Sequence, residues 1–245
     1  MTEPVKFYDH KDEAEIVREW DSIAPIRDRQ VALHQDTSYE QVLEPWILER
    51  VDRLAATKIV DVGCGTGRLT SKLHLRSGET LGIDPSAVSI GLARVRDDTT
   101  RFEVATAEEW VRRGSDLRFD LAVANMVLMD ALDLEGIVGA LATLARGGVV
   151  LATIAHPAFW PIYWDYASRD GFSYLAETVV ETPFRTSSKS YGLVATHVHR
   201  PLELYLSTLR RHGLTVTAFE ELRGPESVDA FPYPRFIGIE ASVLP

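Results

Sequence analysis

The chain has 245 residues, of which 45% are hydrophobic and 25% charged, and this balance predicts one globular domain over residues 1–245. A formal net charge of −10, without a long Lys/Arg run, argues against nucleic acid as a partner. No apolar run approaches the length of a membrane helix, and the single cysteine, Cys64, excludes an internal disulfide or a cysteine-cluster metal site. We therefore expect a cytoplasmic protein, monomeric or homodimeric, that binds neither metal nor membrane.

Strand and helix patterns alternate through the centre of the chain. An N-terminal helical arm is expected over residues 1–36, followed by an amphipathic helix at 40–55. The five predicted strands that follow are 57–63, 79–84, 100–106, 119–127 and 149–156, and the helices between them are 68–75, 85–98, 107–114 and 133–148. Strands that alternate with helices of this length indicate right-handed crossovers and a parallel sheet covered on both faces.

The regular alternation stops after residue 156. Residues 157–199 read as an insertion that contains two strands of a hairpin, at 177–186 and 189–199. A helix at 201–213 and strands at 214–222 and 235–244 follow. The short loop between the last two strands requires antiparallel pairing. The fold class is therefore α/β: a doubly wound, mostly parallel seven-stranded sheet with an antiparallel last strand, an N-terminal helical arm and a lid insertion.

Glycines are concentrated directly after the first strand, in the stretch Asp61-x-Gly63-x-Gly65-x-Gly67. Open α/β sheets bind ligands at this end of a strand, and bare backbone allows a ligand to approach closely. A dinucleotide site would have its third glycine where Arg68 stands, and no Gly-Lys-Ser/Thr follows as a phosphate loop requires.

The stretch "VDVGCGTG" resembles the first motif of class I S-adenosylmethionine-dependent methyltransferases, and the resemblance covers residues 58–155. It implies that the cofactor is S-adenosylmethionine and that the glycine loop receives its methionine and ribose portions. The same resemblance implies that Asp61 helps to hold the amino group of the ligand. A carboxylate there lowers the desolvation cost of a cationic ligand.

The ends of the next three predicted strands carry the remaining cofactor candidates. Asp84 ends "LGIDPS" and is assigned to the ribose diol, with Pro85 beside it, although an N-cap role for Asp84 is the alternative. The turn "VATAEEW" resembles the family's adenine-binding turn, so we assign Thr106, Ala107 and Glu108 to adenine; Thr106 can at the same time form a capping box with Glu109.

The strand "FDLAVANMVLMD" resembles the family's fourth motif, which places Asn125 and Met126 at the junction of cofactor and acceptor. The stretch "ANMV" lacks the Pro-Pro turn of enzymes that methylate nucleic-acid bases. On the N-terminal arm, which resembles a helix that folds over the cofactor, Trp20 and Tyr8 are the covering aromatic candidates.

Aromatic residues crowd the insertion at 157–199, which we interpret as a substrate lid, with a small satellite core as the alternative. The candidate substrate-binding residues are Tyr8, Trp160, Tyr163, Trp164, Tyr166 and His197. The candidate general bases are His156 and His199, because a neutral imidazole can accept a proton near pH 7.

The resemblance implies methyl transfer from S-adenosylmethionine to an oxygen or nitrogen of a small molecule, in bacterial specialised metabolism. Methylation of a peptide or protein terminus is the alternative among enzymes, and a non-catalytic, cofactor-binding regulatory subunit is the alternative outside them. A nicotinamide oxidoreductase is disfavoured by Arg68 and by the antiparallel last strand.

Overall fold

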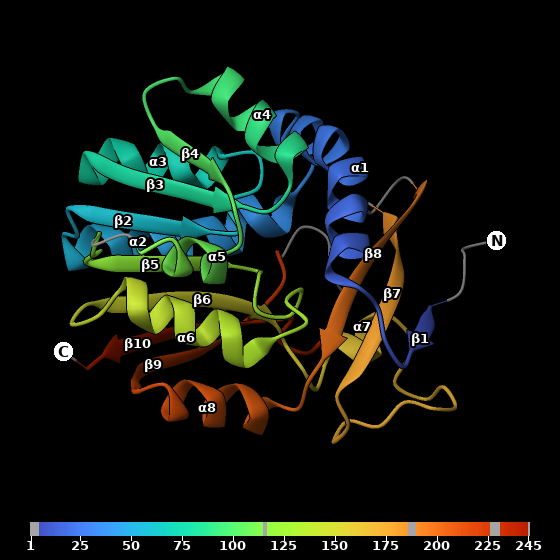
Figure 1. Ribbon diagram of the computed structural model, residues 1–245. Helices are drawn as coiled ribbons and strands as arrows, with labels where there is room; N and C mark the ends of the chain where they lie inside the picture. Colours follow the sequence, from blue (N-terminus) through green and yellow to red (C-terminus); the bar gives the residue numbers. More distant parts are fainter. Residues whose placement is uncertain (1–4, 115–116, 186–189, 226–230, 245) are drawn as a thin grey trace.

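The computed structural model describes residues 5–114, 117–185, 190–225 and 231–244. Its main feature is a seven-stranded sheet with the strand order β4-β3-β2-β5-β6-β10-β9 (Figure 1). The strands are β2 (Lys58–Val62), β3 (Glu79–Asp84), β4 (Arg101–Val104), β5 (Leu121–Asn125), β6 (Val149–Ala155), β9 (Leu214–Leu222) and β10 (Phe236–Val243). Strands β2 to β6 pair in parallel, whereas β10 is antiparallel to both β6 and β9. The predicted fold class is confirmed.

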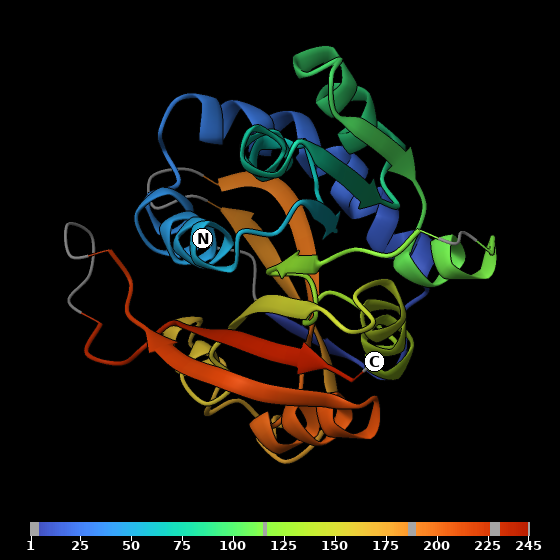
Figure 2. The same ribbon diagram turned by 90° about the vertical axis from the view of Figure 1, so that its left-hand side faces the viewer.

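Helices cover both faces of this sheet. Figure 2 shows α2 and α3 on one side and α5 and α6 on the other. The bounds are α1 (Glu13–Ala32), α2 (Glu44–Leu54), α3 (Arg68–Ser77), α4 (Ala87–Arg96), α5 (Ala107–Arg112), α6 (Leu134–Leu144), α7 (Trp160–Tyr163) and α8 (Leu202–Arg211), with a π-helical turn at Tyr39–Leu43. The strands of the large sheet and the helices between them follow the predicted order, and their ends lie within a few residues of the predicted ones.

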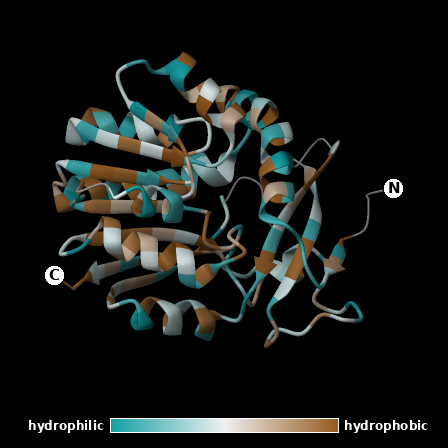
Figure 3. Ribbon diagram, viewed as in Figure 1, coloured by the Kyte–Doolittle hydropathy of each residue, from teal (hydrophilic) through white to brown (hydrophobic). Residues whose placement is uncertain are grey.

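The seven-stranded sheet has a hydrophobic core on each face, and strand β5 contributes side chains to both. Its side chains alternate between the two faces: Ala122 and Ala124 join the core beneath α5 and α6, whereas Leu121 and Val123 join the core beneath α2 and α3. Because both faces are covered, the strand is apolar throughout rather than alternating in polarity. Figure 3 shows hydrophobic residues concentrated along the strands of the large sheet.

The N-terminal arm is helical at Glu13–Ala32, as predicted, but its first described residues are not helical. Residues Lys6–Tyr8 form a strand, β1, which pairs with β7 (Thr178–Arg185), and β7 pairs with β8 (Ser190–His199). The result is a second, three-stranded antiparallel sheet with the order β1-β7-β8. Local sequence did not indicate β1, because its pairing partner lies more than 170 residues away along the chain.

Within the described residues, no helix is long and apolar enough to span a bilayer.

Helix α1 lies between the two sheets. Figure 1 shows it passing the carboxyl ends of β2, β3 and β5, with β7 and β8 on its other side. It contacts α4, which packs against the seven-stranded sheet, and β8 of the three-stranded sheet. The edge of the sheet at which α/β folds bind ligands is therefore covered by α1.

Candidate functional site

A cavity of about 540 Å³ lies where α1 covers the carboxyl ends of the parallel strands. Eleven residues predicted to bind the cofactor line it: Trp20, Asp61, Gly63, Gly65, Asp84, Pro85, Thr106, Ala107, Glu108, Asn125 and Met126. Gly67 is the exception, because it caps the start of α3 instead. A Cβ on Gly67 would lie 2.8 Å from atoms of Ala93 and Phe102, so this glycine serves close packing.

The glycine loop is held by the end of β3. The backbone N–H of Gly63 donates to the carbonyl of Ile83 at 2.8 Å, and that of Gly65 donates to Asp84 Oδ2 at 2.9 Å. Gly65 has a φ of +53°, and a Cβ placed on it would meet nothing within 4 Å. The loop therefore presents bare backbone to the cavity.

Asp84 does not cap the following helix. Ser86 is the N-cap of α4, where its Oγ accepts from the N–H of Ser89 at 3.0 Å, and Asp84 Oδ1 accepts from the N–H of Ser86 at 2.8 Å. Burial raises the pKa of Asp84 to about 6, although the two backbone hydrogen bonds oppose this rise. The carboxylate thus fixes the glycine loop to α4 and also lines the cavity.

Asp61 is almost fully buried at the end of β2 and is only half satisfied. Thr70 Oγ1 donates to its Oδ2 at 2.7 Å, whereas Oδ1 has no hydrogen-bond partner among the described residues. Burial raises the pKa of Asp61 to about 7, and the charge of Asp84 adds to the effect. A buried acceptor oxygen without a donor, in a cavity wall, suits the ammonium of a bound ligand.

The capping box predicted for Thr106 and Glu109 is present at the start of α5, in the cavity wall. The N–H of Glu109 donates to Thr106 Oγ1 at 3.1 Å, and the N–H of Thr106 donates to Glu109 Oε2 at 3.2 Å. Glu13 of α1 faces this wall, and burial together with the charges of Glu108 and Glu109 raises its pKa. Sequence reasoning did not select Glu13.

The end of β5 is strained. Met126 has a φ of +59°, which costs a non-glycine residue about 1–3 kcal/mol. Its N–H donates to both the carbonyl and Oγ1 of Thr153 at 3.0 Å, and Thr153 Oγ1 in turn donates to Asn125 Oδ1 at 2.7 Å. Such strain persists only where surrounding contacts hold it, and it is concentrated at functional sites.

Comparisons with known proteins agree with this geometry. A family model described as a methyltransferase domain matches residues 54–184, which is more than half of the chain. The chain belongs to the methyltransferase domain family. Its fold is that of the class I enzymes that use S-adenosylmethionine, as the resemblance implied.

Two curated relatives of this methyltransferase domain are ubiquinone biosynthesis O-methyltransferases. The protein from Rhodopseudomonas palustris (strain BisA53) is 31% identical over 110 residues, which are 42% of each chain. The protein from Aeromonas salmonicida (strain A449) is 29% identical over 160 residues, which are 63% of this chain and 62% of the relative. The alignments thus span about two fifths and three fifths of these relatives.

A solved neighbour shows the same fold. The 1,6-didemethyltoxoflavin-N1-methyltransferase of Burkholderia thailandensis, solved with its substrate and S-adenosylhomocysteine, has a TM-score of 0.62 and 15% identity. The match covers 98% of this chain and 95% of that chain.

The histidines predicted as general bases do not line the cavity of the methyltransferase domain. His156 is buried beyond β6, where its Nδ1 accepts from the N–H of Ala158 at 3.3 Å and its Nε2 donates to Glu221 at 3.0 Å. His199 Nε2 donates to the carbonyl of Tyr174 at 3.0 Å. The hydrogen bonds of these two histidines therefore lie outside the cavity.

The predicted substrate-binding residues also lie outside the cavity wall. Tyr166 is completely buried, its hydroxyl bonds to His197 Nε2 at 3.1 Å, and its ring meets those of Phe7 and Phe172 edge-on. Burial lowers the pKa of His197 to about 3, so this histidine stays neutral. These contacts correspond to the satellite core, the alternative to the lid.

The remaining aromatic candidates behave similarly. Trp160 packs on Tyr163 and Phe236 at ring distances of 5.5 and 5.9 Å, and Trp164 lies against both Trp160 and Tyr163. Tyr8 donates to Glu181 on β7 at 3.3 Å. None of them lines the cavity.

Asp130 is the main site residue that sequence reasoning missed. It follows β5 in the apolar stretch "MVLMDAL", lines the cavity and is half-buried. Desolvation and the charge of Glu19 raise its pKa well above its usual range, although the charge of Arg200 opposes this rise. An acidic residue in so apolar a stretch was the available indication. Within the part of the chain that the structure describes, no group of three or more His, Cys, Asp or Glu residues could hold a metal ion.

Proposed function

We propose that this methyltransferase domain binds S-adenosylmethionine in the cavity and transfers its methyl group to an oxygen or nitrogen of a small molecule in bacterial specialised metabolism. The observation that carries the proposal is the meeting of the bare glycine loop, Asp61 and Asp84 on one cavity wall. The acceptor class is supported by the names of a sequence relative, an O-methyltransferase, and of a solved structural neighbour, an N-methyltransferase.

The residues present fit this cofactor. Its amino acid portion carries an ammonium, and Asp61 Oδ1 is a buried acceptor that lacks a donor. The volume of about 540 Å³ falls within the usual range for small-molecule sites. Gly65 leaves open space beside the loop backbone, whereas the space beside Gly63 is taken by the side chain of Val127.

When bound, S-adenosylmethionine supplies an electrophilic methyl group on a sulfonium sulfur. The chain contributes position and electrostatics: Asp61 and Asp84 are assigned to opposite parts of the cofactor, and Met126 is held at the end of β5 where the acceptor must approach. Alignment of reacting groups contributes up to about 7–11 kcal/mol in favourable intramolecular cases. Neither His156 nor His199 is needed for this role.

Titration calorimetry with S-adenosylmethionine and with nicotinamide dinucleotides tests the proposal. We expect binding of S-adenosylmethionine alone. Mass spectrometry of extracts incubated with the protein and S-adenosylmethionine should show a product heavier by one methyl group. Tight dinucleotide binding would refute the assignment. Cofactor binding without any methylated small molecule would favour the regulatory subunit, and a methylated peptide would favour the terminus-modifying enzyme.

Gly65→Ala should separate ligand binding from folding. The φ of +53° costs an alanine about 1–2 kcal/mol, yet its Cβ meets no protein atom within 4 Å, and the residue lines the cavity. We expect a modest loss of stability and a loss of about tenfold or more in cofactor affinity, which corresponds to about 1.4 kcal/mol. The matched control is Gly67→Ala, which collides with Ala93 and Phe102 and should destabilise the fold much more. Wild-type affinity in the folded Gly65→Ala variant would contradict the site.

A further inference from the structure

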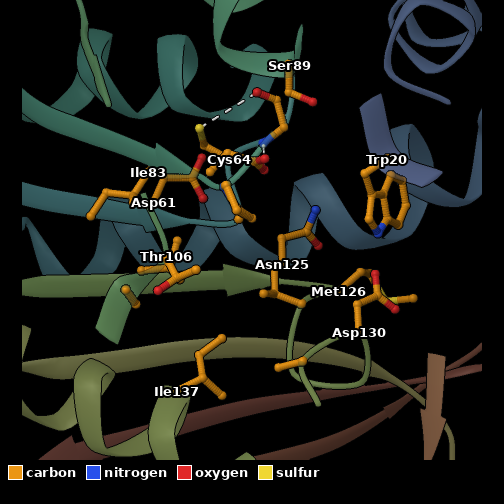
Figure 4. Close-up of a pocket in the computed structure, with 18 of the residues that line it drawn as sticks. Trp20, Asp61, Cys64, Ile83, Ser89, Thr106, Asn125, Met126, Asp130 and Ile137 are labelled. Carbon is orange, nitrogen blue, oxygen red and sulfur yellow. Dashed lines mark hydrogen bonds between the residues drawn. The ribbon is translucent and has the colours of Figure 1, made fainter. Parts of the chain in front are cut away.

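Asp130 is a half-buried carboxylate at the cavity wall, and no described residue donates a hydrogen bond to its side chain. Its backbone N–H donates to the carbonyl of Val127 at 2.8 Å, which closes a turn directly after β5. Figure 4 shows Asp130, Met126 and Trp20 together at one end of the cavity, with Asp61 and Cys64 at the other. We call the part bounded by Trp20, Met126 and Asp130 the acceptor end.

The turn that carries Asp130 is rigidly held. Arg200 is fully buried, and its guanidinium donates to the carbonyls of Leu128, Ala131 and Leu132 at 3.1, 2.9 and 2.8 Å. These carbonyls flank Asp130 on both sides. The N–H of Val198 on β8 also donates to the carbonyl of Met129. The position of the carboxylate is therefore fixed by the fold.

Among the described residues, no cation forms an ion pair with Asp130. The N–H groups of Arg200 are directed to the turn carbonyls, and its Nε donates to Glu177 at 2.7 Å. The neighbouring charge on α1 is acidic: Glu19 raises the pKa of Asp130, and Glu19 Oε2 is itself buried without a hydrogen-bond partner among the described residues. The charge of Arg200 acts in the opposite direction and lowers the pKa of Asp130, although its N–H groups donate to other acceptors.

The cavity as a whole is acidic. Its acidic lining residues are Glu13, Asp61, Asp84, Glu108, Glu109, Asp130 and Asp133, and its basic ones are Arg27, Arg68 and Arg112. Arg27 and Arg68 are already paired with Asp36 and Asp28. An acceptor that carries a carboxylate would be repelled, whereas one that carries an amine supplies both donors and positive charge.

We propose that the methyl acceptor is a small amine and that Asp130 binds its nitrogen at the acceptor end; this rests on the proposed function. The amine binds as an ammonium and gives one proton to the Asp130 carboxylate, from which the proton passes to water. The freed lone pair of the nitrogen then forms the new nitrogen–carbon bond while the carbon–sulfur bond breaks and its electron pair stays on sulfur. Asp130 is thus a catalytic residue. Burial favours a carboxyl that holds this proton.

Matched probes on one skeleton test the acceptor class. The full chain, saturated with S-adenosylhomocysteine, is titrated with phenethyl and indole-ethyl compounds that carry an amine, an alcohol or a carboxylate, with binding measured by ligand-observed NMR. We expect the amines to bind and the carboxylates not to bind. Preference for alcohols or carboxylates, or the absence of amine binding at millimolar concentration, overturns the proposal.

Asp130→Asn tests the residue itself. The substitution keeps shape and removes charge, and should weaken amine binding about tenfold or more, as loss of a hydrogen bond to a charged group does. Affinity for S-adenosylhomocysteine should stay within about twofold. The matched control Asp98→Asn removes one exposed carboxylate and should leave both affinities unchanged.

Four results would each refute the assignment or separate it from the proposed function. Unchanged amine affinity in Asp130→Asn refutes it, as does an equal loss of S-adenosylhomocysteine affinity, which would move Asp130 to the cofactor. Asp130→Ala provides the same comparison if the amide variant does not fold. Failure of the wild-type chain to bind S-adenosylhomocysteine refutes the proposed function itself, whereas bound S-adenosylhomocysteine without amine preference refutes only this inference.

Discussion

At the scale of the residue, Asp61 shows how a ligand site conflicts with stability. The carboxylate is buried, with one oxygen bonded to Thr70 and the other without a donor, and its pKa rises from 3.8 to about 7. A folded-state pKa above the unfolded one means that the folded chain binds more protons between about pH 4 and 7. The free energy of unfolding therefore falls as pH rises through this range. A cationic ligand offsets the cost.

Asp61→Asn should consequently stabilise the unliganded protein at pH 8 and weaken its binding of S-adenosylmethionine. The amide oxygen still accepts from Thr70, but no buried charge forms. We expect a higher melting temperature at pH 8, and a much smaller difference at pH 5, where Asp61 is protonated in the wild type. Wild-type affinity for the cofactor should also rise from pH 5.5 to 8, as Asp61 and Asp84 ionise. Lower stability of the variant at pH 8 would contradict this account.

At the scale of the element, Arg200 connects the insertion to the large sheet. It follows β8 directly, and its guanidinium holds the turn after β5 through three carbonyls. The insertion thus contributes to the cavity indirectly, through the turn that it fixes. Its aromatic residues pack among themselves instead.

Arg200→Lys should break this connection, because an ammonium cannot reach three carbonyls in the planar geometry of a guanidinium. We expect a loss of about 3 kcal/mol in the free energy of unfolding, the usual cost of disrupting a buried charged network. Urea denaturation measures it. Arg211→Lys, in a half-exposed pair with Glu135, is the control and should change stability little. Equal small losses in both variants would remove Arg200 from this role.

At the scale of the whole molecule, a buried ion network joins the N-terminal arm to the small sheet. Lys11 Nζ donates to Glu181 on β7 at 2.8 Å and to Thr196 on β8 at 2.7 Å, and it also pairs with Glu19 of α1. Burial lowers the pKa of Lys11, but its two glutamate partners outweigh this and raise it overall. The network fixes α1, and with it Trp20, over the cavity.

Lys11→Met should loosen the arm, because Glu19 and Glu181 are then left buried without their shared cation. We expect stability to fall by about 3 kcal/mol and hydrogen exchange to accelerate in α1 more than in the large sheet. Lys6→Met is the control: Lys6 is half-exposed beside the same Glu181, and its loss should cost under about 1 kcal/mol. Uniform acceleration across both sheets would show that the arm has no separate role.

Local patterns sufficed for most of the large sheet and the cofactor wall. Strand and helix periods, the glycine loop and acidic strand ends are properties of neighbouring residues, and parallel strands bring their carboxyl ends to one edge. Of the cofactor candidates, Gly67 was displaced from the cavity, because its tight contact with Phe102 depends on a strand more than 30 residues away.

The histidines, the aromatic insertion and Asp130 show what local patterns leave open. His156 and His199 have the chemistry of a base, but their Nε2 atoms are hydrogen-bonded to Glu221 and to the carbonyl of Tyr174. Asp130 stands in an apolar stretch, yet β8 and Arg200 fix its turn beside the cavity. The sequence by itself determined the fold class and the cofactor edge, because periodicity and backbone freedom are encoded locally. Only the tertiary structure decided which side chains line the cavity, because that depends on partners brought together from distant parts of the chain.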